Sequence, residues 1–178
     1  MSLYAPSIVA VDQFPTVDLT GLTSYSFNSS AGFDPVKHYA WRIMLEDVTP
    51  SAARDLWVRY SGVSGASTYS SILQFLKVDA NTGQFLNVPG NAFQLTVASV
   101  LPSGTGATGF VDMAPGAAGT NPRFFSKTYY QDNSSVVMRA TCEGMALTGG
   151  VASSFDLLLS GAGTFTKGKL YIQASRRA

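Results

Sequence analysis

The chain has few of the residues on which reactive and metal-bound sites depend. Its 178 residues include one cysteine, Cys142, and one histidine, His38. A single cysteine excludes an internal disulfide, and with one histidine it is too few for a zinc site. Residues 104–109 have the G-x-G-x-x-G spacing of a dinucleotide loop, but no helix or parallel-strand unit is expected after them. We therefore predict neither a metal nor a cofactor, and expect Cys142 to be a small buried residue.

Charge is scarce as well. Charged residues make up 13% of the chain, about half the usual share, and the 12 basic and 11 acidic residues are spread along it. Such a distribution produces no field that would attract nucleic acid or an anionic membrane, so we predict neither partner. A weakly charged surface suits a subunit that is covered by its neighbours.

Long hydrophobic runs are also missing. The first 14 residues lack the basic start and apolar centre of a secretory signal, and no apolar stretch reaches the length of a membrane span. We expect a chain that is made in the cytoplasm without a signal peptide and is not inserted into a membrane.

What the sequence does have is β-strand alternation, most clearly over residues 38–46. Tyr39, Trp41, Ile43 and Leu45 alternate there with polar residues, which indicates a strand with one buried face. His38 belongs to the polar set and is expected to face outward.

A second alternating strand follows over residues 56–60. Leu56, Val58 and Tyr60 are expected to face inward, and Trp57 and Arg59 outward. We expect this strand to pair with or neighbour the first.

Short β-rich segments separated by turns occupy most of the remaining chain. Residues 24–35 are expected to form a surface loop, and residues 102–121 a long loop with regular structure only near 109–113. No amphipathic helix and no repeat is evident, so the pattern predicts an all-β antiparallel sandwich, jelly-roll-like, in one domain over residues 17–178 after an extended lead-in over 1–16. The further strands are expected at 17–19, 71–78, 85–88, 93–97, 124–130, 135–142, 154–159 and 164–173.

The sequence contains no recognisable catalytic motif. A nucleophile needs a base, and His38 is the only histidine and has no Gly-x-Ser-x-Gly motif beside it. A pair of carboxylates can hydrolyse glycosides, but the sequence does not show which acidic residues meet in space. We predict that the protein is not an enzyme. The alternative is a glycan hydrolase, for which the candidate carboxylates are Glu46, Asp47, Asp55, Asp112 and Asp156.

Aromatic residues offer the clearest candidates for binding. Trp57 beside Arg59, Tyr69 in a Gly/Ser-rich loop, and Tyr129 with Tyr130 near polar residues have the chemistry to stack on a sugar ring and bond its hydroxyls. The same side chains also suit a core or a contact between subunits. These five residues are the predicted site for a glycan or a neighbouring subunit.

Several segments together resemble a family of phage proteins. They are VDLTGL at 17–22, the strand at 39–50 that ends in Val48 and Pro50, LWVRYS at 56–61, FDLLLSG at 155–161 and GKLYI at 168–172. This set is similar to small β-sandwich virion proteins of tailed bacteriophages, of the tail-fibre type. The resemblance implies a jelly-roll or galectin-like fold and a structural or adhesive role without catalysis.

The leading interpretation is therefore a bacteriophage virion protein on the tail or its fibres. It would assemble with other virion proteins and with its own copies, a trimer being expected from the common symmetry of virion surfaces, and would contact host-surface glycans through loops. The alternatives are a capsid decoration or head-spike protein and a stand-alone carbohydrate-binding module.

Overall fold

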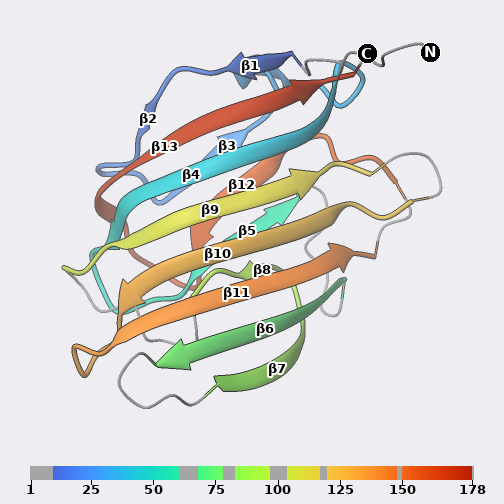
Figure 1. The fold of residues 1–178 in the computed structure, drawn as a ribbon. Helices are drawn as coiled ribbons and strands as arrows, with labels where there is room; N and C mark the ends of the chain where they lie inside the picture. Colours follow the sequence, from blue (N-terminus) through green and yellow to red (C-terminus); the bar gives the residue numbers. More distant parts are fainter. Residues whose placement is uncertain are drawn as a thin grey trace, which may run out of the picture.

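The computed structural model describes residues 10–60, 68–77, 83–96, 104–116, 120–147 and 150–177. These residues form two antiparallel sheets that pack face to face, with the smaller sheet behind the larger one in Figure 1. The predicted all-β antiparallel sandwich is confirmed. Within the described part of the chain, no helix has the length and apolar character needed to cross a membrane.

The larger sheet has nine strands in the described residues. Its order is β1-β13-β4-β9-β10-β11-β6-β7, and β2 also pairs with β13. The first strand lies within the predicted lead-in and pairs with the end of β13. The strand bounds are β1 Val11–Gln13, β2 Val17–Asp18, β4 His38–Pro50, β6 Tyr69–Lys77, β7 Gly83–Gly90, β9 Ala107–Ala114, β10 Arg123–Gln131, β11 Val137–Ala146 and β13 Phe165–Arg176.

The smaller sheet has four strands in the order β3-β12-β5-β8. Their bounds are β3 Ser24–Phe27, β12 Phe155–Leu159, β5 Leu56–Tyr60 and β8 Phe93–Gln94. This sheet covers one face of the larger sheet and leaves the other uncovered (Figure 1). The strand order does not confirm the jelly-roll topology, which stays a prediction.

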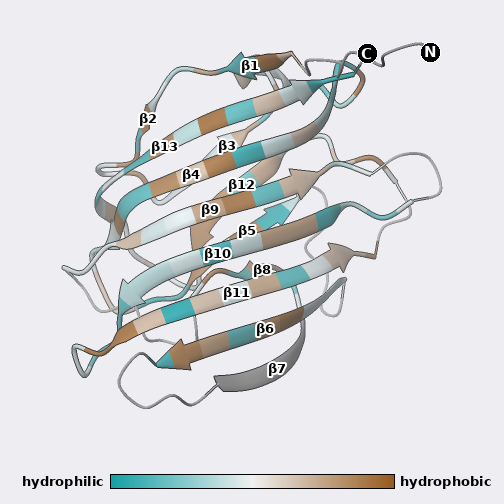
Figure 2. Ribbon diagram, in the orientation of Figure 1, coloured by the Kyte–Doolittle hydropathy of each residue, from teal (hydrophilic) through white to brown (hydrophobic). Residues whose placement is uncertain are grey.

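The core lies between the sheets and is built by the alternating residues of each strand. Trp41, Ile43 and Leu45 of β4 are buried, as are Leu56, Val58 and Tyr60 of β5. Figure 2 shows the corresponding change between hydrophilic and hydrophobic residues along β4 and β13. The predicted inward faces of these two strands are confirmed at those positions, and Cys142 is buried as expected.

The expectation that β5 pairs with or neighbours β4 is wrong, because the two strands belong to different sheets. The chain crosses from the larger to the smaller sheet between Pro50 and Leu56. Both edges of β4 are already occupied, by β13 on one side and β9 on the other. Since both partners come from distant parts of the sequence, local alternation gave no sign of them.

The start of β4 also differs from the prediction. His38 pairs with Arg176 while Ala40 pairs with Ser175, so Tyr39 is an extra residue in a β-bulge. The bulge shifts the alternation by one position. His38 therefore turns inward and is buried, whereas Tyr39 is exposed.

Two predicted loops contain regular structure. Residues 24–35 include β3 and a short 3₁₀ helix, η1, Ser29–Ala31, because Phe27 and Phe33 bury their rings in the core on either side of it. Residues 107–114 form β9, a long strand between β4 and β10. The sequence DANTG at 79–83 is typical of a turn, and all but its last residue lie outside the described residues.

Candidate binding surface

The uncovered face of the larger sheet, which we call the outer face, carries large apolar side chains that solvent reaches. They alternate with the core residues of their strands, and no element of the described chain covers them (Figure 1). Isolated exposed apolar residues are normal, but a group on one face indicates a surface for interaction. The exposed residues of the outer face are Tyr39, Ile72, Phe125, Tyr129, Val137 and Met145.

A shallow groove crosses the outer face at right angles to the strands. It follows the row of cross-strand neighbours Ser175, Ala40, Ala114, Arg123, Met145 and Ser70. The short side chains of Ser175, Ala40, Ala114 and Ser70 leave space on either side of Arg123 and Met145. Four hollows of about 380, 330, 320 and 510 Å³ adjoin along this row and share lining residues. We call this feature the sheet groove.

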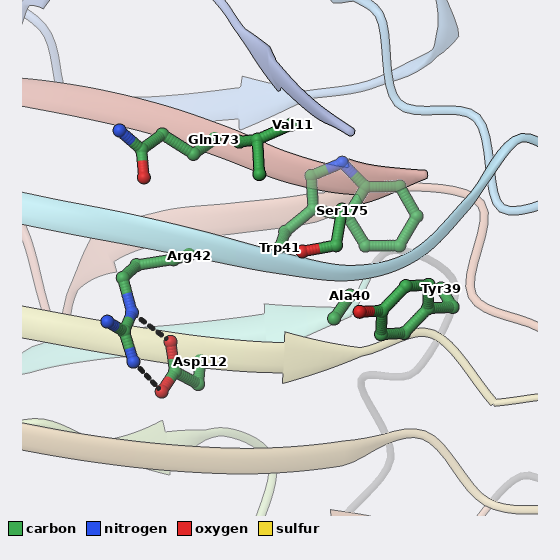
Figure 3. A pocket seen from close by; sticks show the side chains of 8 residues that line it. All are labelled: Val11, Tyr39, Ala40, Trp41, Arg42, Asp112, Gln173 and Ser175. Carbon is green, nitrogen blue, oxygen red and sulfur yellow. Dashed lines mark hydrogen bonds and ion pairs between the residues drawn. The ribbon is translucent and has the colours of Figure 1, made fainter. Parts of the chain in front are cut away.

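One end of the sheet groove contains an ion pair with two parallel hydrogen bonds. Arg42 Nε donates to Asp112 Oδ1 at 2.6 Å and Arg42 Nη2 donates to Asp112 Oδ2 at 2.7 Å (Figure 3). The hydrogen bonds to Asp112 raise the pKa of Arg42 above its ordinary value. Gln173 and Tyr39 line the same hollow, with Gln173 on the side of the ion pair and Tyr39 at the opposite end (Figure 3).

An apolar ridge runs diagonally over three neighbouring strands of the outer face. It consists of Phe110 on β9, Phe125 on β10 and Met145 on β11, and the two rings lie 6.0 Å apart between centroids. The guanidinium of Arg42 also lies over the Phe110 ring, at 4.9 Å from its centroid. The ridge therefore joins the ion pair to the middle of the sheet.

The predicted site residues do not form one site. Trp57 and Arg59 lie on the outer side of the smaller sheet, where Arg59 Nε is 3.4 Å from Asp156 Oδ2. Tyr129 lies on the outer face of the larger sheet, with Lys127 Nζ 5.5 Å from its ring centroid. The two groups are thus on opposite sides of the sandwich.

Tyr69 and Tyr130 are buried, which corrects the expectation that they contact a ligand. Tyr69 begins β6 and is 0% exposed, so it does not lie in a surface loop. Burial raises its pKa to about 12. Tyr130 is 3% exposed because its side of β10 faces the core.

The candidate acidic residues are dispersed and each has its own partner. Glu46 accepts a hydrogen bond from Tyr171, Asp47 is paired with Lys167, and Asp112 and Asp156 are paired with arginines. Asp55 is buried beside Ser160, whose hydroxyl accepts from its backbone N–H. Among the described residues, no group of three histidine, cysteine or acidic side chains is placed to hold a metal ion.

His38 has a structural environment at the edge of the larger sheet. Its Nε2 lies 2.8 Å from Asp12 Oδ2, and its Nδ1 lies 3.1 Å from the carbonyl oxygen of Asp34. Lys37 and Arg176 also bind the Asp12 carboxylate. These contacts hold the pKa of Asp12 well below its ordinary value, the hydrogen bonds from Arg176 being the largest cause. The cluster fastens β1 to β13 and β4.

No model of a known protein family matches the chain, and no curated protein matches it. The family suggested by the resemblance therefore stays a prediction.

The residues of the apolar ridge were missed because the sequence does not show which side of β10 is buried. Phe124 and Tyr130 alternate with Phe125 and Tyr129, so both sides contain aromatic rings. The buried set even includes the polar Ser126 and Thr128. Only the positions of the neighbouring strands distinguish the two sides.

Proposed function

We propose that the chain is a non-enzymatic structural subunit of a bacteriophage virion, associated with the tail or its fibres. It assembles with its own copies and with other virion proteins by burying the outer face of the larger sheet. The observation that carries this proposal is the group of exposed apolar side chains on that face, where Phe125 is 37% and Tyr129 is 44% exposed.

The size of the outer face is sufficient for a stable contact. Six strands from β13 to β6 span about 24 Å at about 4.8 Å per strand, and the nine residues of β10 extend about 30 Å. The resulting area of about 700 Å² is close to the roughly 800 Å² that each partner contributes to a standard interface. Burial of a fully exposed Phe or Ile contributes about 1.5–3 kcal/mol, so several half-exposed residues together supply a useful driving force.

The virion part of the proposal is supported by the resemblance of the strand and turn segments to tailed-phage proteins, and the low charge agrees with a subunit that neighbours cover. The alternative is a capsid decoration or head-spike protein, which would use the same face.

Immunogold labelling of intact particles of the phage that encodes the chain tests these options. Gold on the tail supports the proposal, gold on the capsid shell supports the alternative, and purified particles without the chain overturn both.

Glycan binding is the second candidate function, and the hollow around Tyr39 favours it. The hollow combines the exposed ring of Tyr39, which can stack on a sugar, with the planar groups of Arg42, Asp112 and Gln173, which can bond hydroxyls. The test is a glycan array with the purified chain and its Tyr39→Ala variant. Binding that the substitution abolishes supports this function, and background signal for the unchanged chain rejects it.

A further inference from the structure

Charged residues flank the apolar ridge in a regular arrangement. On β9 and β10, Phe110 pairs with Lys127 and Phe125 pairs with Asp112. On β10 and β11, Phe125 pairs with Glu143, while Arg123 pairs with Met145. The four side chains named on each pair of strands form a square. In each square, two neighbouring ridge residues occupy one diagonal, and two residues of opposite charge occupy the other.

Most of these charges have no partner within the described chain. Arg123 and Glu143 are exposed, and neither has an ion pair among the described residues; Lys127 has none there either and lies over the ring of Tyr129. Asp112 is bound to Arg42 but keeps 37% of its side chain exposed. The face thus has one cation and one anion on each side of the apolar ridge, Lys127 with Glu143 on one side and Arg123 with Asp112 on the other.

A second copy of the same face complements this arrangement. When the copy is turned by 180° about an axis along the apolar ridge, each charged corner of a square falls on the opposite charged corner, and each ridge residue falls on its own copy. Arg123 then faces Glu143 of the second copy, and Asp112 faces Lys127 of the second copy. Strand spacing of about 4.8 Å and a side-chain repeat of about 6.6 Å leave these corners a few Å out of register, which long side chains can bridge.

We propose that two copies of the chain pack through their outer faces around this twofold axis, with the apolar ridges in contact and the charges on either side paired between copies. The inference deepens the proposed function by naming the partner of the outer face. Such a contact is isologous, so it closes after two copies and gives a dimer in place of the trimer expected from the sequence. Because each charge is paired with its opposite, the contact also resists other registers of the two faces.

Charge reversal tests the proposal on the purified full chain. Arg123→Glu places two carboxylates opposite each other twice per dimer, and Glu143→Arg places two cations opposite each other twice. Each single variant is expected to weaken the dimer at least tenfold in sedimentation equilibrium, and the double variant Arg123→Glu/Glu143→Arg to restore it. Circular dichroism checks that these exposed substitutions leave the fold intact. A monomeric wild-type chain, single variants that dimerise like the wild type, or a double variant that fails to recover would each overturn the pairing.

Crosslinking tests the position of the axis separately. A residue on the axis meets its own copy across sheets that pack about 10 Å apart, which is too far for a direct disulfide but suits a short bismaleimide. Phe125→Cys and Met145→Cys should each give a covalent dimer, whereas the control Ser24→Cys, exposed on the smaller sheet, should stay monomeric. Equal crosslinking at Ser24→Cys, or none at either ridge position, contradicts the proposal. Because both experiments use purified protein, their failure would leave the location on the virion to the labelling experiment.

Discussion

Tyr60 and Tyr69 connect the two sheets reciprocally. The hydroxyl of Tyr69, from the larger sheet, accepts from the backbone N–H of Tyr60 at 2.8 Å and lies 3.2 Å from its carbonyl oxygen. The hydroxyl of Tyr60, from the smaller sheet, reaches the carbonyl oxygens of Ala114 and Arg123 at 2.9 and 2.7 Å. Both rings are fully buried, so these bonds form where water cannot replace them.

We predict that Tyr69→Phe destabilises the fold by about 1–3 kcal/mol, because the substitution leaves the buried N–H and C=O groups of Tyr60 without this partner. The free energy of unfolding in urea is the measurement. Tyr129→Phe is the matched control, since that tyrosine is exposed and its hydroxyl has no hydrogen bond within the described residues. Equal stability of the two variants would show that the link between the sheets contributes little.

The cluster around Asp12 predicts a pH-dependent contribution to stability. The folded-state pKa of Asp12 lies below its ordinary value of 3.8, because Arg176, His38 and Lys37 bind the carboxylate. Such a group stabilises the fold above the unfolded pKa and loses that contribution as the pH falls through the folded pKa. Asp12→Asn should therefore lower the free energy of unfolding at pH 7, and its difference from wild type should shrink as the pH falls below about 4.

The comparison of the two proteins from pH 7 to pH 2 isolates Asp12, since the other acidic residues titrate in both. Urea unfolding followed by fluorescence gives the two stability curves. A difference that stays constant or widens in acid would mean that Asp12 acts through its shape and not through its charge.

The sequence predicted the sandwich because its strands obey a local rule. Alternation over Trp41–Leu45 and Leu56–Tyr60 reflects one buried side, and this property is visible without knowing the partner strands. The same rule failed at His38 and Tyr39, where a bulge inserts one residue and reverses the facing of both.

The binding surface was much less predictable than the fold. The apolar ridge depends on the register of β9, β10 and β11. The sequence pattern placed β9 within a predicted loop, so its pairing with β10 was not expected. The predicted aromatic site failed for a related reason. Tyr129 and Tyr130 are adjacent, so they must point to opposite sides of β10, and the sequence did not show which side is open.

The close approach of β10 to Gly109 leaves no room for a side chain at this position in the middle of the larger sheet. A Cβ atom at this position would lie 2.1 Å from the carbonyl oxygen of Lys127 and 2.8 Å from the Cα of Thr128, both backbone atoms of the neighbouring strand β10. Gly109→Ala should separate β9 from β10 locally and lower stability by about 1–3 kcal/mol, as overpacking commonly does.

Gly90→Ala is the matched control for this substitution, because its new Cβ atom would lie at an ordinary contact distance of 3.6 Å from the carbonyl oxygen of Ala92. Thermal unfolding of both variants is the measurement. If Gly109→Ala melts with the wild type, the two strands have more freedom to move apart than their register implies.

The reactivity of the buried Cys142 thiol is expected to report on unfolding of the chain. It lies on β11, which pairs with β10 and β6 along both edges, and it is 1% exposed. Burial raises the pKa of the thiol to about 12, so the reactive thiolate is rare at neutral pH in the folded chain. Iodoacetamide at pH 8 should modify the native chain slower than the urea-unfolded chain by several orders of magnitude, with a rate that follows the unfolding equilibrium as urea is added. A native rate within a few fold of the unfolded rate would mean that the centre of the larger sheet opens locally, and mass spectrometry of the labelled chain distinguishes the two outcomes.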